Sequence, residues 1–185
     1  MNRAVFFDRD GVIVKNVDSE APRKVGDLRL NLESIPIIKA LQQRGYNIIV
    51  VSNQPDVALG KIDEKTKKSL IKIFKQLLKK HRISSLGFYY CFHHPQGVIK
   101  KYTKDCNCRK PKPGMLLKAI RDWKIDPAKS YIIGDRATDI KAGSLTGIKT
   151  ILIDPRNSEV NYLLQYNVRA NFRIKKLSDA LDIII

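Results

Sequence analysis

The chain has 185 residues, and its 35 Lys and Arg residues outnumber its 18 Asp and Glu residues to give a net charge of +17. Apolar residues make up 43% of the chain, enough for a hydrophobic core, which excludes a disordered basic tail. The length suits one domain over residues 1–185. The positive charge leaves three classes of partner open: nucleic acid, an anionic membrane surface and a small acidic substrate.

The sequence gives no sign of export or membrane insertion. The apolar run at the amino terminus is too short for a signal peptide, and no apolar run approaches the length that crosses a bilayer. We therefore expect a cytoplasmic monomer with no membrane association. Three cysteines cannot all pair within one chain, which favours metal binding or free thiols over disulfides.

Short β-rich segments alternate with segments of helical periodicity. In chain order the predicted elements are a strand at 4–7, a helix at 32–44, a strand at 47–51, a helix at 63–81, a strand at 87–91, a helix at 113–123, a strand at 131–133, a helix at 138–145, a strand at 149–153 and a helix at 178–184. This alternation predicts an α/β fold with a doubly wound parallel sheet and right-handed crossovers. Ligands of such sheets bind at the carboxyl ends of the strands.

Two carboxylates follow the first predicted strand. Asp8 and Asp10 flank Arg9, so in an extended chain the carboxylates share one side and Arg9 points away. Two close carboxylates repel each other unless a cation lies between them, and oxygen ligands of this kind suit Mg²⁺. The pattern Asp-x-Asp-Gly also occurs in solvated turns. Its position after a buried strand favours the metal site.

Polar residues also follow other strands. Ser52, Asn53 and Gln54 could receive a phosphate oxygen or form a plain polar turn. Asp135 follows the strand at 131–133 and could complete the cation site. Asp139 comes four residues later, near a helix start, where pairing with the helix dipole is an alternative role.

Basic residues concentrate in two segments. Residues 61–82 contain nine basic and two acidic residues, and residues 100–112 contain six and one. The first segment supplies the outer face of an amphipathic helix, for which a solvated surface is the simplest interpretation. The second places Arg109 and Lys110 ahead of the helix at 113–123, whose start suits an anion. Its positive field would attract a small phosphorylated substrate, and also nucleic acid.

Two close-spaced pairs of metal-ligating residues are separated by twelve residues. The four candidates are Cys91, His93, Cys106 and Cys108. Their number and type fit a closed tetrahedral Zn²⁺ site, with free thiols and a surface histidine as the alternative. His94 competes with His93, but side chains two apart in an extended segment share a face, which favours His93. Without an open coordination position the zinc would be structural and would order the zinc loop, at about 91–108.

Four short motifs follow one another along the chain. They are Asp8-x-Asp10-Gly, Ser52-Asn-Gln, Lys110 and Gly134-Asp135-x-x-x-Asp139. This set resembles the motifs of the haloacid dehalogenase-like phosphatases over about residues 4–153. The resemblance implies a Rossmann-like fold and Mg²⁺-dependent hydrolysis of a phosphomonoester through an aspartyl-phosphate intermediate.

The resemblance also implies roles for single residues. Asp8 would be the nucleophile and Asp10 the general acid and base. Mg²⁺ would be held by Asp8, the backbone carbonyl of Asp10 and Asp135, with Asp139 behind them. Ser52 and Lys110 would bind the transferring phosphoryl oxygens.

The zinc loop narrows the resemblance. The segments at 89–97 and 106–115 look like those of the D-glycero-D-manno-heptose 1,7-bisphosphate 7-phosphatases, which serve the synthesis of nucleotide-activated heptose for lipopolysaccharide. Such enzymes have no large cap domain, so the zinc loop shapes the entrance for a phosphorylated sugar. The implied substrate-binding residues are Asn53, Gln54, Arg109 and Arg136, with Arg109 meeting the second phosphate or the sugar.

Two segments depart from that pattern. Residues 55–60 read Pro-Asp-Val-Ala-Leu-Gly where the heptose enzymes typically carry Ser-Gly-Ile-Ala-Arg-Gly, so an arginine is missing and an acid is gained. Residues 15–20 lack the usual His-Gly-Tyr. Both departures lie where the sugar would lie and leave the catalytic set intact, so they bear on substrate choice.

Other functions compete with the heptose phosphatase. Histidinol-phosphate phosphatases share the catalytic motifs and a similar zinc loop, and the positive charge would suit a polynucleotide 3′-phosphatase or a zinc-bearing nucleic-acid-binding module. Pure binding would not need Asp8, Asp10, Lys110 and Asp135. The chain also lacks clustered aromatic residues near the site on which bases could stack. The sequence therefore favours a small sugar phosphate over nucleic acid.

Overall fold

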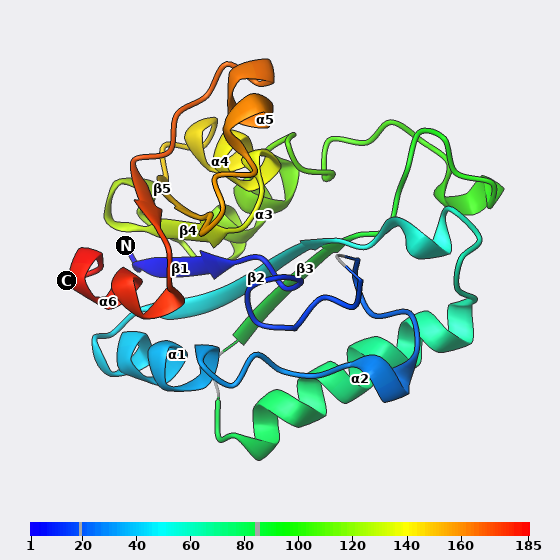
Figure 1. Ribbon diagram of the computed structural model, residues 1–185, viewed down its shortest axis with the longest axis horizontal. Coiled ribbons are helices and arrows are strands. Elements are labelled where there is room, and N and C mark those ends of the chain that lie inside the picture. Colours follow the sequence, from blue (N-terminus) through cyan, green and yellow to red (C-terminus); the bar gives the residue numbers. More distant parts are fainter. Residues whose placement is uncertain (19, 84–85) are drawn as a thin grey trace.

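The computed structural model describes residues 1–18, 20–83 and 86–185. Ser19, which belongs to the segment 15–20 that differs from the heptose phosphatases, lies outside the described residues. Its strands form one parallel sheet in the order β3-β2-β1-β4-β5-β6. The strands are β1 (Ala4–Phe7), β2 (Asn47–Asn53), β3 (Leu86–Cys91), β4 (Tyr131–Gly134), β5 (Lys149–Ile153) and β6 (Phe172–Ile174). The predicted doubly wound α/β fold is confirmed (Figure 1).

Helices cover both faces of the sheet. They are α1 (Ser34–Gln43), α2 (Glu64–Lys80), α3 (Gly114–Asp122), α4 (Ala137–Ser144), α5 (Val160–Gln165) and α6 (Ala180–Ile183). Helices α1, α2 and α6 lie on one face, and α3, α4 and α5 on the other (Figure 1). In β1, Val5 and Phe7 pack towards the first layer, and Ala4 and Phe6 towards the second. Successive side chains of a strand point to opposite faces, so a strand buried on both sides is apolar throughout.

The structure adds and adjusts a few elements. Helix α5 and strand β6 were not predicted, because six and three residues are too short to show a periodicity. Strand β2 extends to Asn53, so Ser52 and Asn53 belong to the strand rather than following it. The predicted helix at 178–184 begins as a 3₁₀ turn at Leu177–Asp179 before α6.

The strand order creates a crevice beside β1. The chain goes from β1 to β2 and β3 on one side and later to β4, β5 and β6 on the other. At such a switch point the loops after the two central strands diverge and leave room for a ligand. Asp8 directly follows β1, Asp135 directly follows β4, and Ser52 lies near the end of β2. The candidate site is therefore where the topology places ligands.

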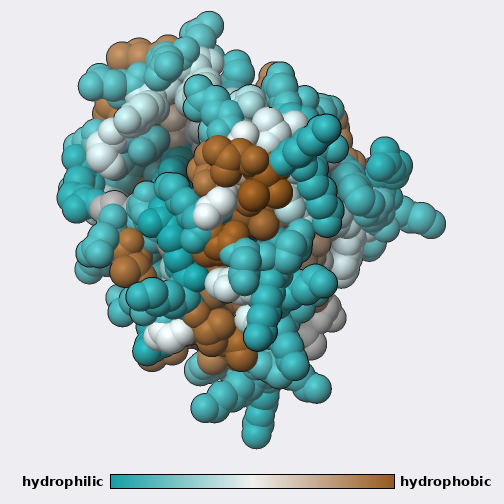
Figure 2. All heavy atoms as spheres, turned by 90° about the vertical axis from the view of Figure 1, so that its right-hand side faces the viewer, coloured by the Kyte–Doolittle hydropathy of each residue, from teal (hydrophilic) through white to brown (hydrophobic). Residues whose placement is uncertain are grey.

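The charged face of α2 behaves as a solvated surface. Leu70, Phe74 and Leu78 are buried against the sheet, whereas lysines at 68, 72, 75 and 79 are exposed and have no carboxylate partner in the described part of the chain. Figure 2 shows the side of the molecule that is on the right in Figure 1: hydrophilic side chains cover most of it around a central strip of apolar ones. Among the described residues no helix could span a membrane, and no separate cap domain is present.

Candidate active site

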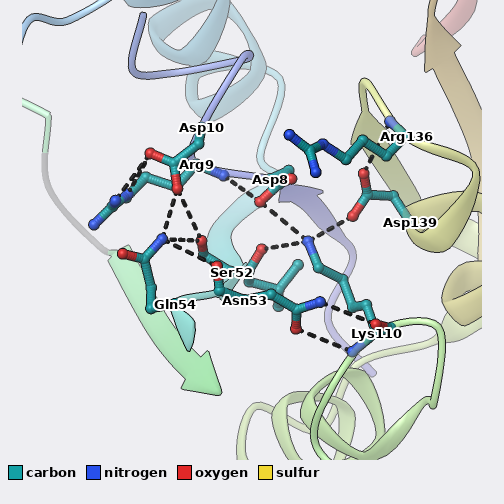
Figure 3. A network of polar contacts seen from close by, with 10 residues as sticks. Asp8, Arg9, Asp10, Ser52, Asn53, Gln54, Lys110, Arg136 and Asp139 are labelled. Carbon is teal, nitrogen blue, oxygen red and sulfur yellow. Dashed lines mark hydrogen bonds and ion pairs between the residues drawn. The ribbon is translucent and has the colours of Figure 1, made fainter. Parts of the chain in front are cut away.

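Lys110 lies at the centre of the candidate site. Its Nζ is 3.0 Å from Oδ1 of Asp8 and 2.5 Å from Oδ1 of Asp139, and it donates a hydrogen bond of 3.0 Å to the carbonyl of Val51 (Figure 3). The side chain is 2% exposed. Burial disfavours its charge, but the carboxylates of Asp139 and Asp8 outweigh burial and raise the pKa of Lys110 above its usual value. The residue is therefore a fixed cation that links β2, the residue after β1 and the first turn of α4.

Three carboxylates converge beside this lysine. One oxygen from each of Asp8, Asp135 and Asp139 lies within 4.8 Å of the others. Burial raises the pKa of Asp135 to about 7, with a further contribution from Asp139. Burial also raises the pKa of Asp8, against the effect of Lys110. Oδ1 of Asp135 is buried and has no hydrogen-bond partner among the described residues, so the group fits a hard divalent cation.

Two glycines let these carboxylates approach. Gly11 has a φ of +81°, and a Cβ there would lie 1.9 Å from Oδ2 of Asp135. A Cβ on Gly134 would lie 2.4 Å from the Asp139 side chain. Any larger residue at either position would displace a carboxylate, so both glycines shape the site directly.

Asp10 is held at both carboxylate oxygens. Gln54 donates a hydrogen bond of 2.6 Å from Nε2 to Oδ2, and the Ser52 hydroxyl lies 3.5 Å from the same oxygen. Arg9 was expected to point away; instead its Nε donates a hydrogen bond of 2.9 Å to Oδ1 of Asp10. The Arg9 side chain is fully buried and packs over the Phe74 ring, so its charge needs this carboxylate.

Asn53 contacts the backbone of Lys110. Its Nδ2 donates to the Lys110 carbonyl at 2.9 Å, and its Oδ1 accepts from the Lys110 amide at 3.0 Å. Both halves of the side-chain amide are therefore used within the protein. Asn53 therefore fastens the Lys110 backbone to the end of β2, in addition to lining the cleft where its substrate contact is predicted.

Asp139 combines the two roles that the sequence left open. Its Oδ2 accepts a hydrogen bond of 3.2 Å from the Arg136 backbone amide at the start of α4, and its Oδ1 pairs with Lys110. A carboxylate in the first turn is favoured by the helix dipole. The helix thus orients a carboxylate that also faces the candidate cation site.

The candidate zinc ligands meet in space. Cys91, His93, Cys106 and Cys108 place one ligand atom each within 4.8 Å of the others, and the closest S–S and N–S separations are 3.0 to 3.8 Å. Zinc bonds of about 2.3 Å to sulfur suit a cluster of this size. His94 instead lines the cleft, and its Nδ1 accepts a hydrogen bond from the Gln96 amide. The structure thus selects His93 over His94.

The candidate site opens into a cleft of about 400 Å³. Predicted residues on its lining are Asp8, Asp10, Asn53, Gln54, Arg109, Lys110 and Arg136. Further charged residues that sequence reasoning did not single out also line it: Glu20, Arg23, Asp56 and Lys61. They lie on turns outside the motifs, and only the departures at 15–20 and 55–60 drew attention to this region.

Comparison with known proteins assigns the family. The HAD-hydrolase-like family matches residues 107–180. A D-glycero-beta-D-manno-heptose-1,7-bisphosphate 7-phosphatase from Photorhabdus laumondii is 36% identical over 95% of this chain and 92% of that protein. The chain belongs to the heptose-1,7-bisphosphate 7-phosphatase family. The enzyme of the same description from Escherichia coli K12 is 36% identical over 80% of this chain and 76% of its own length. Membership of this family makes the chain a phosphatase.

Solved structures agree on the fold. The D,D-heptose 1,7-bisphosphate phosphatase from B. bronchiseptica, solved with magnesium and phosphate, superposes with a TM-score of 0.81 at 22% identity, over 98% of this chain and 97% of that one. A HAD-like phosphatase from Mesorhizobium loti has a TM-score of 0.80 at 26% identity, covering 99% of this chain and 84% of that chain. The HAD-like fold without a large cap domain is thus confirmed.

Proposed function

We propose that this phosphatase removes the 7-phosphate of D-glycero-D-manno-heptose 1,7-bisphosphate during the synthesis of nucleotide-activated heptose. The observation that carries the proposal is the buried ion-paired group Asp8–Lys110–Asp139 at the base of a cleft lined by further arginines, in a chain that shares more than a third of its sequence with heptose phosphatases. The group supplies a carboxylate nucleophile, and the cleft offers cations to a second phosphate.

In the first step a carboxylate oxygen of Asp8 attacks the phosphorus of the 7-phosphate. The bond from Asp8 to phosphorus forms, the bond from phosphorus to the C7 oxygen breaks, and Asp10 donates a proton to the leaving alkoxide. In the second step Asp10 takes a proton from water, the water oxygen bonds to phosphorus, and inorganic phosphate leaves Asp8. Division into two steps lowers the barrier of an otherwise very slow hydrolysis.

The remaining polar groups prepare this chemistry. Gln54 and Arg9 hold the Asp10 carboxylate in one orientation. The reaction therefore avoids the entropic cost of orienting this group. The ammonium group of Lys110 and the hydroxyl of Ser52 would bind the phosphoryl oxygens. Asn53 fixes the Lys110 backbone in this arrangement.

The carboxylate group fits Mg²⁺. The ion would be held by Asp8 and Asp135, with Asp139 close by and the backbone carbonyl of Asp10 as a further ligand. An ion held there would neutralise the repulsion between the nucleophile and the phosphate and would keep Asp8 ionised.

We infer that the four-residue cluster of the zinc loop binds a structural Zn²⁺. The protein would fill all four ligand positions, which would leave none for a substrate. Cys108 directly precedes Arg109 and Lys110, and zinc binding would therefore fix the segment that carries both cations. The three cysteines form no disulfide with one another, which also favours a cytoplasmic enzyme. We propose that it works there as a single-domain monomer, which light scattering of the purified protein would test.

A direct test compares three substrates under one set of conditions: heptose 1,7-bisphosphate, histidinol phosphate and a 3′-phosphorylated oligonucleotide. We expect the heptose bisphosphate to have the highest kcat/KM and phosphorus NMR to show that the phosphate at C1 remains. A preference for histidinol phosphate or for the oligonucleotide would overturn the proposal.

Salt dependence adds an independent criterion. A polynucleotide binds through many phosphates and loses affinity steeply as salt rises, whereas a sugar bisphosphate makes few such contacts. We therefore expect turnover to fall only shallowly as the salt concentration is raised. A steep loss would point to a nucleic-acid substrate.

A further inference from the structure

The outer part of the cleft is lined by a network of paired charges. Arg23 donates from Nε to Oδ2 of Asp56 at 3.0 Å and forms an ion pair with Glu20. Lys61 lies 3.8 Å from the other oxygen of the Glu20 carboxylate. We call these four residues the outer wall. They join the segment at 20–23 to the turn at 55–61, and together they carry no net charge.

The position of Asp56 is fixed by its surroundings. Its side chain is 17% exposed, and its backbone carbonyl accepts a hydrogen bond of 2.9 Å from the Lys61 amide. It lies in a 3₁₀ turn at Pro55–Val57, directly after Gln54, whose side chain holds Asp10. A short, rigid path therefore connects the outer wall to the residue that protonates the leaving group.

The outer wall differs chemically from the other cations of the cleft. Arg109 and Arg136 have no carboxylate partner in the described part of the chain, so their charge is available to a phosphate. In the outer wall the charge is neutralised, but hydrogen-bonding capacity remains. The Arg23–Asp56 pair uses Nε and Oδ2, and among the described residues Nη1 of Arg23 and Oδ1 of Asp56 have no hydrogen-bond partner. Guanidinium donors beside carboxylate acceptors suit hydroxyl groups, which both donate and accept.

We propose that the Arg23–Asp56 pair, supported by Glu20 and Lys61, binds the hydroxyl groups of the sugar and makes the cleft selective for a polyhydroxylated sugar phosphate. The inference rests on the proposed function and adds a specificity site to it. Charge-assisted hydrogen bonds to a hydroxyl reject an analogue that lacks it, because the polar groups of the protein are then left unpaired.

The test compares D56N, R23Q and the double variant R23Q/D56N with the wild type. Two substrates are used with Mg²⁺ present: heptose 1,7-bisphosphate and p-nitrophenyl phosphate, which has no hydroxyl groups. We expect each single variant to raise KM for the sugar about tenfold with little change in kcat, the size of effect expected when hydrogen bonds to charged groups are lost. The same variants should leave kcat/KM for p-nitrophenyl phosphate close to its wild-type value. The double variant should lose no more than the worse single variant, because the two residues act as a pair.

Controls separate selectivity from folding. K118Q breaks a surface pair with Asp122 on α3, which does not line the cleft, and should leave both substrates unaffected. Equal losses on both substrates in D56N and R23Q would overturn the inference and show that the pair only supports the turns. An unchanged KM for the sugar in both variants would overturn it as well.

Failure of the proposed function would give a different result. If the wild type hydrolyses p-nitrophenyl phosphate but not heptose 1,7-bisphosphate, the proposed substrate is wrong. The same variants are then assayed on a series of hexose and pentose phosphates. A selective loss on those sugars in D56N would keep the outer wall as a hydroxyl-binding site, whereas an absence of activity on every sugar phosphate, or equal losses on sugars and p-nitrophenyl phosphate, would overturn it.

Discussion

The two ends of the cleft are built differently. At the base, the side chains of Asp8, Lys110 and Asp139 are 1% to 11% exposed; Asp8 directly follows β1, Lys110 lies in the loop ahead of α3, and Asp139 lies in the first turn of α4. At the outer wall, side chains on turns are 17% to 54% exposed. Removing one partner of a buried ion pair strongly lowers the free energy of unfolding, whereas exposed pairs contribute little to stability. The sheet therefore fixes phosphoryl transfer, and the loops are free to set the choice of substrate.

The strongest way to break this comparison is to remove the nucleophile. Asp8→Asn should lower kcat by at least about 10⁴-fold, because an amide does not attack phosphorus and no second carboxylate occupies its place. Circular dichroism and zinc content should match the wild type. Turnover within tenfold of the wild type would refute the assignment of Asp8.

A smaller effect should follow from loosening the base without touching the reacting groups. Asn53→Ala removes both hydrogen bonds to the Lys110 backbone and should lower kcat up to about 100-fold, since small displacements of catalytic groups are costly. Asn47→Ala is a matched control: Asn47 lies at the other end of β2 and also bonds a backbone carbonyl, that of Arg3. Normal turnover in Asn53→Ala, or an equal loss in Asn47→Ala, would contradict the positioning role.

Removal of zinc from the zinc loop should affect the two ends of the cleft differently. Metal analysis should give about one zinc per chain, and Cys106→Ser should lose it and lower Tm by at least about 5 °C. KM for the sugar should rise about tenfold because Arg109 loses its support, while the Asn53 contact keeps Lys110 in place. Thr103→Ala, within the same loop but outside the cluster, should keep its zinc. A zinc-free wild type of full stability would refute the structural site.

The smallest effect should come from the contact between the zinc loop and α2. Hydrogen bonds from Lys67 and Tyr102 lower the pKa of Glu64 from 4.5 to about 2. A carboxylate whose pKa is lowered in the folded state stabilises the fold at pH values above its ordinary pKa. That stabilisation is lost as the pH falls from 4.5 towards 2. Urea unfolding should therefore show Glu64→Gln less stable than the wild type at neutral pH, with the difference vanishing in acid. A difference that does not change with pH would contradict this contribution.

Sequence periodicity predicted the fold almost completely because the sheet is buried on both faces. Five of the strands are apolar runs between helices of clear period, and their predicted positions agree with the structure to within two residues. Helix α5 and strand β6 escaped because they are short and lie at the edge of the sheet, where part of each stays exposed. Six helix residues and three strand residues are too few to show a periodicity, whereas the edge strand β3, with six strand residues, was predicted.

The site could be predicted where function depends on strand ends, and not where it depends on contacts between loops. Asp8 and Asp135 converge because the topology brings the ends of β1 and β4 together, and Lys110 reaches Asp8 from the loop ahead of α3. The acid gained at Asp56 was visible in the sequence, but its partner Arg23 was not, because an ion pair across two turns leaves no spacing signal. The burial of Arg9 against Asp10 was missed for a similar reason: alternation gives the direction of a side chain and not the path of a long one.

The most direct measurement of the central claim is to trap the phosphoryl group on the enzyme. Asp10→Asn is mixed with p-nitrophenyl phosphate, whose leaving group departs without an acid, and is quenched at early times. Since the variant cannot activate water for the second step, peptide mass spectrometry should find one phosphoryl group on Asp8, formed with a burst of p-nitrophenol. A burst-free variant with no covalent phosphate, or with phosphate on another residue, would contradict the account.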